Sequence, residues 1–228
     1  MLDCSRHFFS VAEVKRVLDI LALHNLNRFH WHLTDDQGWR FEVPGYPKLT
    51  TIGSKRNGTV LGRNSELTDR TPYGPYFYTD AEIRDIVKYA ADRYITIVPE
   101  VDMPGHMTAA LAAYPELGCT GGPYEVGQYW GVYQDILCAG NPKTFEFIKA
   151  VIDKVCDLFP TSPYINIGGD EAPKSRWKEC PKDQKLISQQ GFVDKDGQTK
   201  EDQLQGYLAR RVEAYLATKG RKVMGWDE

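Results

Sequence analysis

Acidic, basic and histidine side chains recur along the sequence, each set directly after a short apolar segment. The four sets are Arg6 and His7; Asp35 and Asp36; Asp102 and His106; and Asp170 and Glu171. One such residue alone is most simply a helix cap or a solvated loop charge, and Asp170 could cap a helix beginning near Pro173. Four successive sets favour a shared polar site, where burial and mutual repulsion would separate the carboxyl pKa values and keep one carboxyl protonated near neutral pH.

Three kinds of chemistry could use such a site. His30 and His32 could begin a metal site, since alternate strand residues share a side, but no histidine lies beyond His106 and no His/Cys pair follows the later segments. A serine hydrolase needs a G-x-S-x-G elbow, which the sequence lacks. Glycoside hydrolysis needs a carboxylic acid of raised pKa and a second anionic group, and Asp170 and Glu171 could supply both. We therefore expect no metal and no cofactor.

The adjacency of Asp170 and Glu171 limits the mechanism. Carboxyl groups of a retaining pair stand about 5 Å apart on opposite sides of the reacting carbon, whereas neighbouring Cα atoms on one strand end are ~3.8 Å apart. One of the two must therefore do something other than attack. A 2-acetamido oxygen of the substrate could attack the anomeric carbon while Glu171 protonates the leaving oxygen and Asp170 orients the acetamide N–H. Gly168 and Gly169 would then allow the sugar to approach closely.

Hydrophobic periodicity predicts the elements that must position these side chains. Strands are expected at residues 2–6, 27–33, 94–98, 164–167 and 222–226, with helices after the first four. Capping boxes at Ser10 and Thr79 and an N-cap at Asn141 predict three helix starts, and the stripe from Leu204 to Tyr215 predicts the fourth helix. Helix-to-strand connections are short, but three of the four strand-to-helix connections are long, including a polar loop at residues 34–78.

This alternation is typical of an α/β fold with a parallel sheet, whose active sites form at the C-terminal ends of the strands. No G-x-G-x-x-G or P-loop motif follows a strand, which favours a (β/α)8 TIM barrel over a nucleotide-binding doubly wound sheet. We expect residues 1–228 to form the N-terminal part of one barrel domain, with five strands and four helices and no second domain. Open strand edges would then need the rest of the barrel or another copy to cover them.

Composition excludes several classes of protein. The 228 residues include 28 basic and 31 acidic side chains, a formal net charge of -3, which indicates neither nucleic acid nor an anionic membrane as a partner. No segment reaches the ~18 continuous apolar residues of a membrane span, and residues 1–6 lack the pattern of a signal peptide. Among five cysteines, Cys119 and Cys138 bracket a Gly/Tyr-rich loop and could close it as a disulfide; two free thiols are the other interpretation.

Four long motifs resemble those of a known family. They begin at Leu2, His30, Val98 and Ile167 and read LDxxRHFF, HWHLTDDQGWR, VPEVDMPGH and IGGDE. In this order, over essentially the whole chain, they are similar to the signatures of β-N-acetylhexosaminidases, glycoside hydrolase family 20. The resemblance implies a retaining exo-glycosidase that releases terminal β-linked N-acetylglucosamine or N-acetylgalactosamine through an oxazoline intermediate. It also implies a (β/α)8 barrel and a periplasmic, extracellular or lysosomal location.

The resemblance also implies roles for individual residues. Glu171 matches the family's acid/base, and Asp170 matches the aspartate that orients the acetamido group. Four further residues are expected to bind substrate, and one to support their network: Arg6, Asp35, His106 and Trp226, with Asp102 in support. The sequence departs from the family after the fifth strand, where the resemblance implies three more strands and a tyrosine that polarises the acetamide. The alternative function is therefore a truncated, non-catalytic fragment with at most weak sugar binding.

Overall fold

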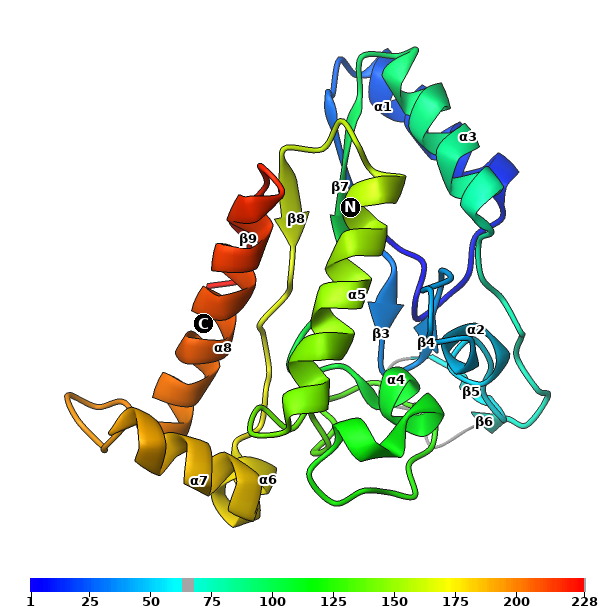
Figure 1. Cartoon of the computed structure of the whole chain (residues 1–228). Coiled ribbons are helices and arrows are strands. Elements are labelled where there is room, and N and C mark those ends of the chain that lie inside the picture. Colours follow the sequence, from blue (N-terminus) through cyan, green and yellow to red (C-terminus); the bar gives the residue numbers. More distant parts are fainter. Residues whose placement is uncertain (63–67, 228) are drawn as a thin grey trace.

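A five-stranded parallel sheet forms the centre of the computed structural model, which describes residues 1–62 and 68–227 (Figure 1). Its strands are β1 (Leu2–Asp3), β2 (Arg28–His32), β7 (Thr96–Glu100), β8 (Tyr164–Asn166) and β9 (Lys222–Met224). They lie in the order β1-β2-β7-β8-β9, each parallel to its neighbours. The predicted α/β class with a parallel sheet is therefore confirmed, while the (β/α)8 barrel stays a prediction.

One long helix connects each strand to the next. The four helices are α1 (Val11–Leu23), α3 (Asp80–Ala91), α5 (Pro142–Leu158) and α8 (Lys200–Thr218). They form a row in which α1 packs beside α3, α3 beside α5 and α5 beside α8 (Figure 1). The neighbours in this row follow the order of the strands, as expected when every crossover has the same hand.

Local capping signals fix the starts of these helices. Both predicted capping boxes are confirmed, because the Ser10 and Thr79 hydroxyls accept the N–H groups of Glu13 and Glu82. Asn141 caps α5, also as predicted. A third capping box, which begins at Thr199, starts α8 ahead of the predicted stripe from Leu204 to Tyr215.

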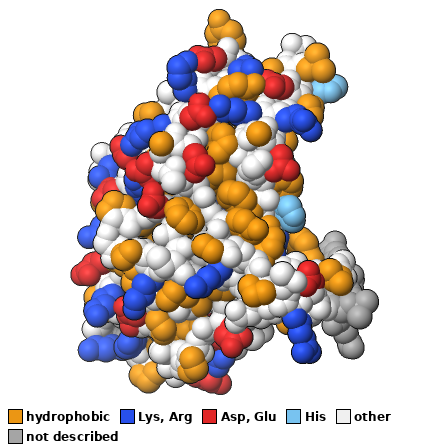
Figure 2. Space-filling model, turned by 90° about the vertical axis from the view of Figure 1, so that its right-hand side faces the viewer, with side chains coloured by type: hydrophobic (Ala, Val, Ile, Leu, Met, Phe, Trp, Pro, Cys, Tyr) orange, Lys and Arg blue, Asp and Glu red, His pale blue; other side chains and the backbone are white. Residues whose placement is uncertain are grey.

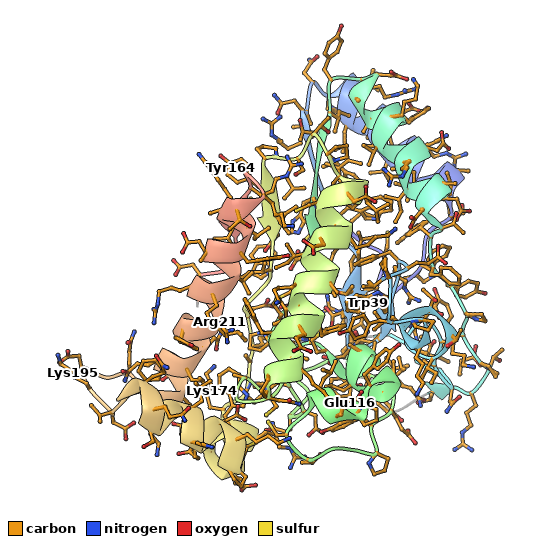
Figure 3. The ribbon with its side chains drawn as sticks, in the orientation of Figure 1. Trp39, Glu116, Tyr164, Lys174, Lys195 and Arg211 are labelled. Atoms are coloured by element: carbon orange, nitrogen blue, oxygen red, sulfur yellow. The ribbon has the colours of Figure 1, made fainter. Side chains whose placement is uncertain are left out.

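The long connections carry short elements and buried side chains rather than open polar loops. After β2 come β3 (Thr34–Asp35), β4 (Gly38–Trp39), α2 (Lys48–Thr51), β5 (Thr59–Val60) and β6 (Thr68–Asp69); residues 63–67 of the predicted loop lie outside the described residues. After β7 come α4 (Thr108–Ala113) and η1 (Pro115–Leu117), and after β8 come α6 (Ser175–Glu179) and α7 (Pro181–Gln190). Trp39 is buried 5.9 Å from the Phe147 ring of α5, which anchors the first connection (Figure 3).

Arg40 ties this first connection to the end of β1. Its guanidinium is fully buried and donates to the backbone carbonyls of Cys4, Ser5, Ser54 and Tyr76. Burial lowers the pKa of Arg40 to about 10, so the group is still charged at neutral pH. Because its guanidinium donates to four carbonyls at once, Arg40 satisfies buried backbone groups that are not hydrogen-bonded within a sheet.

The surface mixes charges of both signs. On the face drawn in Figure 2, the described Lys, Arg, Asp and Glu side chains are interspersed, with apolar side chains between them. Within the described residues, no helix combines the length and apolar composition that crossing a membrane requires.

Candidate active site

The parallel sheet brings the C-terminal ends of its strands to one edge, where the predicted polar residues meet. The register sets His32 of β2 opposite both Asp3 of β1 and Glu100 of β7, and Glu100 opposite Asn166 of β8. Side chains from segments separated by up to 136 residues in the sequence therefore contact one another. The sequence predicted this convergence because active sites of parallel sheets form at this edge.

A tight turn after β1 positions Arg6. One carboxylate oxygen of Asp3 accepts the backbone N–H groups of Ser5 and Arg6 at 2.9 and 3.0 Å, so the strand ends here and not at the predicted residue 6. The Arg6 guanidinium then lies 2.8 Å from Asp35 and 3.0 Å from Asp3. Burial opposes its charge, but these two carboxylates raise the pKa of Arg6. His7, predicted beside it, is exposed and packs against Phe9.

Asp35 is the buried centre of the network. Its carboxylate lies 2.7 Å from the His32 Nε2 and 2.8 Å from Arg6, and it also accepts the backbone N–H of Asp36. Burial would raise its pKa, but hydrogen bonds with His106 and His32 and the charge of Arg6 outweigh burial and lower the pKa of Asp35. Because its side chain is wholly shielded from solvent, Asp35 can influence a ligand only through its neighbours.

His106 connects this centre to the two adjacent acids. It has a left-handed backbone (φ +53), and its Nδ1 lies 2.9 Å from the Asp36 carboxylate. The opposite nitrogen, Nε2, lies 3.4 Å from Glu171 and 3.8 Å from Asp170. Although burial disfavours the charged ring, its bonds to Asp35 and Asp36 raise the pKa of His106 to about 11. The ring is therefore an imidazolium whose Nε2–H faces both acids.

Asp170 and Glu171 follow β8 in a turn of unusual backbone. Gly168, Gly169 and Glu171 all have positive φ, at +64, +95 and +46. For a residue as bulky as Glu this conformation is uncommon and occurs mainly at functional sites. The Glu171 side chain is 49% exposed and the Asp170 side chain 23%. Helix α6 begins only at Ser175, with Lys174 at its N-cap, so Asp170 is not the helix cap that the sequence also allowed.

One oxygen of Asp170 has no hydrogen-bond partner among the described residues. Asp170 Oδ1 is buried and accepts no hydrogen bond from the described residues. A buried acceptor left unpaired costs about 1–3 kcal/mol, so native structures rarely keep one without a reason. A ligand N–H placed here would satisfy this oxygen.

Asp102 is a buried carboxyl of raised pKa, whereas the sequence assigned the acid of raised pKa to the pair Asp170 and Glu171. It is 1% exposed and accepts the Gly169 backbone N–H at 3.1 Å. Burial, together with the charges of Asp170 and Asp35, raises the pKa of Asp102 well above its ordinary value. A Cβ on Gly168 would fall 1.9 Å from the Asp102 carboxylate. Glycine is thus required at 168 to admit Asp102, whereas the sequence assigned that role to an approaching sugar.

Glu100 joins Trp226 to the network and was missed by the sequence analysis. The Trp226 indole N–H donates to Glu100 at 3.0 Å, and Glu100 also bonds to His30 and, at 3.1 Å, to His32. Burial opposes ionisation, but the two histidines lower the pKa of Glu100 to about 2. Burial opposes a charged His32 ring, but its contacts with Asp35 and Glu100 raise the pKa of His32 to about 10.

The position of β7 was the signal that could have identified Glu100 from the sequence. The sequence predicted a strand at residues 94–98, but β7 runs from Thr96 through Pro99 to Glu100. Had the sequence analysis placed this strand two residues later, Glu100 would have been expected beside His30 and His32.

A cavity of about 850 Å³ opens beside Glu171. Gly168 and Trp226 line it from the sheet, and Leu208 and Val212 line it from α8. Trp226 is 46% exposed and lies at its edge. The cavity thus offers an aromatic wall and an acid at one end and an apolar wall along α8.

Two groups of site residues approach the spacing of metal ligands: Asp35, Asp36 and His106, and Asp102, His106 and Asp170. Both depend on His106. Its Nδ1 is hydrogen-bonded to Asp36 and its pKa is raised to about 11, so a metal ion would have to displace a proton from the ring in order to bind it.

Comparison with known proteins identifies the family. The family model for the catalytic domain of glycosyl hydrolase family 20 matches residues 1–228. The chain belongs to this family. It is 47% identical over 228 residues to a β-hexosaminidase of Porphyromonas gingivalis and 41% identical over 232 residues to one of Vibrio furnissii. All of this family 20 chain is covered in both comparisons, but only 27% and 36% of the two relatives.

Solved structures agree with this assignment. A β-N-acetylhexosaminidase crystal structure has a TM-score of 0.86 and 34% identity, covering 99% of this chain and 45% of that one. An exo-β-N-acetylglucosaminidase of Vibrio harveyi in complex with N-acetylglucosamine has a TM-score of 0.82 and 39% identity, covering 100% of this chain and 34% of that one. The family 20 chain therefore spans less than half the length of these relatives.

Proposed function

We propose that this family 20 chain carries the catalytic residues of a retaining exo-β-N-acetylhexosaminidase. Its substrates would be oligosaccharides or glycoconjugates ending in β-linked N-acetylglucosamine or N-acetylgalactosamine. The observation that supports this most directly is the pairing of Glu171 with Asp170 in front of one imidazolium, with an unpartnered buried oxygen on Asp170. Adjacent acids suit a substrate that brings its own nucleophile.

In the first step, the acetamide carbonyl oxygen attacks the anomeric carbon as the glycosidic C–O bond breaks. Glu171, more exposed than its neighbour, gives its proton to the leaving oxygen. Asp170 Oδ1 accepts the acetamide N–H, which orients the group and stabilises the positive charge that develops on the oxazolinium ring. In the second step, the Glu171 carboxylate takes a proton from water, and the water oxygen bonds to the anomeric carbon. The bond between that carbon and the acetamide oxygen of the oxazolinium ring breaks, so the configuration is retained overall.

The other site residues hold this geometry. Arg6 lies at the exposed side of the network, where its guanidinium can reach sugar hydroxyls, and Trp226 can pack against the acetamido methyl. We predicted substrate contacts for Asp35 and His106 as well; their burial supports indirect roles, with Asp35 positioning Arg6 and His106 facing both acids. Asp102 supports the turn through Gly169.

The domain proposed for residues 1–228 is the N-terminal part of a (β/α)8 catalytic barrel. The apolar wall of the cavity, from Leu208, Val212 and Val223, supports a covering partner, either further barrel strands or another copy. The family resemblance supports a periplasmic, extracellular or lysosomal location.

The test is release of a coloured phenol from an aryl N-acetyl-β-glucosaminide. Glu171→Gln should lower kcat at least ~100-fold on poor leaving groups, and Asp170→Asn should lower it by a similar factor, about 100-fold or more, on all substrates. Glu213→Gln, an exposed change on α8, is the matched control. Unchanged rates in either site variant would refute the assignment.

The same assay separates the enzyme from its alternative. Residues 1–228 are compared with a longer version that continues past residue 228. Equal activity in both would refute the need for a covering partner. Activity in neither, with weak N-acetylglucosamine binding retained, would favour the non-catalytic fragment.

A further inference from the structure

A cluster of three cysteines and one aspartate lies outside the candidate active site. Cys119 follows η1, Cys138 precedes α5, and Cys180 and Asp183 lie at the N-terminus of α7. Their four ligand atoms all lie within 4.8 Å of one another, and all five cysteines of the chain are unpaired thiols. Cys138, Cys180 and Asp183 are buried, and Cys119 is half-buried.

We propose that these four residues form a structural zinc site. Three thiolates and a carboxylate fill the four positions of a closed tetrahedral site, and soft sulfur ligands select Zn²⁺ over Mg²⁺ or Ca²⁺. The pair Cys180-x-x-Asp183 has the two-residue separation typical of a zinc knuckle. The inference concerns folding and is independent of the proposed activity.

The distances fit tetrahedral coordination. With Zn–S near 2.3 Å and Zn–O near 2.0–2.2 Å, two sulfurs of a tetrahedron stand about 3.8 Å apart, and a sulfur and an oxygen about 3.5 Å apart. The Cys138 and Cys180 sulfurs are 3.7 Å apart. Asp183 oxygens lie 3.2 Å from the Cys119 sulfur and 3.6 Å from the Cys138 sulfur. Pairs as far as 4.8 Å apart need to close by about 1 Å, a side-chain adjustment.

The surroundings also favour a bound cation. Asp183 is 0% exposed, yet no Lys, Arg or His nitrogen of the described residues lies within 4.0 Å of its carboxylate. A buried carboxylate without a cation is costly. The Gly140 backbone N–H donates to it, and a Cβ on Gly140 would fall 2.2 Å from the Lys182 carbonyl. The loop before α5 is thus pressed against the first turn of α7, which holds the Gly140 N–H against the Asp183 carboxylate.

An entry path reaches the cluster from the surface. A second cavity, of about 550 Å³, is lined by Cys119, Glu116, Lys143 and Lys182, and Figure 3 labels Glu116 beside α4. The two lysines would offset the net negative charge of a site with three thiolates and a carboxylate around one Zn²⁺. The ion would join the connections that follow β7 and β8.

The experiment measures zinc in the 228-residue chain. Reduced protein is stripped with chelator, loaded with Zn²⁺, gel-filtered and analysed for metal; Co²⁺ loading reports the tetrahedral thiolate spectrum. We expect about one Zn²⁺ per chain and a Tm raised by at least ~4 °C on loading. Cys180→Ser and Asp183→Asn should lose most of the bound metal, whereas Cys156→Ser, outside the cluster, keeps it.

Three results would overturn the proposal. One is wild-type protein that holds less than ~0.1 Zn²⁺ per chain after loading. The second is zinc retained equally by Cys180→Ser and the Cys156→Ser control. The third is a native Cys119–Cys138 or Cys138–Cys180 disulfide that survives in protein able to turn over or bind sugar. The wild-type stoichiometry decides the matter even if a variant fails to fold.

Discussion

Replacing Asp102 with asparagine should change the pH dependence of stability without breaking the fold. Asp102 and Asp35 lie in one network, but their environments act in opposite directions. Asp35 contacts Arg6 and two histidines, whereas burial and two neighbouring aspartates raise the pKa of Asp102. If Asp102 is protonated in the folded protein, asparagine is close to it in shape and charge, and still accepts the Gly169 N–H.

The size and sign follow from proton linkage. Aspartate in the unfolded chain titrates near ~3.9, and folded Asp102 keeps its proton to higher pH. Between these two pKa values the folded state binds one more proton, so the free energy of unfolding falls by about 1.4 kcal/mol per pH unit as pH rises. Asp102→Asn lacks this loss. Within this window the variant should gain about 1.4 kcal/mol relative to wild type for each pH unit.

Urea unfolding followed by tryptophan fluorescence measures this difference at several pH values. His32 and His106, with pKa values raised to about 10 and about 11, stay charged in the folded protein across the window and affect both proteins alike. Asp35→Asn is the contrasting control, expected to lose about 3–5 kcal/mol because it leaves buried cations unpaired. Parallel pH curves for wild type and Asp102→Asn would show that Asp102 is ionised and refute the reasoning.

Two further substitutions test the supports of the site. Arg40→Met should cost about 3–5 kcal/mol in urea unfolding, because four buried carbonyls lose their donor; a loss below ~1 kcal/mol would show that water replaces it. Gly168→Ala should cost at least ~3 kcal/mol, since its Cβ would fall 1.9 Å from Asp102 at φ +64. The control Gly45→Ala, at φ +82 with open space around it, should cost only about 1–2 kcal/mol. Equal losses of stability in the two variants would mean that backbone strain alone, and not the clash with Asp102, causes the loss at Gly168.

The elements could be predicted from the sequence because their signals are local. Each capping box spans four residues, and the stripe of a helix repeats within a few turns. The third strand was predicted two residues too early, at residues 94–98 and not at Thr96–Glu100. Pairing of Pro99 with Trp31 is a contact between distant segments, and tertiary context overrode propensity there.

The chemistry of the site could be predicted only in part. Motifs located the acids at the strand ends, but not which acid would stay protonated. Asp35 and Asp36 are neighbours, yet the pKa of Asp35 is lowered while burial raises that of Asp36. Which of the two faces Arg6 depends on the turn after β1. The cysteine cluster likewise joins residues up to 64 apart, and spacing alone suggested either a Cys119–Cys138 disulfide or two free thiols.

The strand order explains why the network spans the sheet. Arg6 after β1 contacts Asp35, Asp35 contacts His32 of β2, His32 contacts Glu100 of β7, and Glu100 contacts Trp226 after β9. Positive and negative groups alternate from Arg6 to Glu100, and the last contact joins Glu100 of β7 to Trp226 after β9, although β8 lies between these two strands. Because each member fixes the charge of the next, removing one leaves its neighbours unpaired in a buried setting, which makes their contributions non-additive. The two ends of the proposed sugar pocket, Arg6 and Trp226, are thus held by one continuous set of bonds.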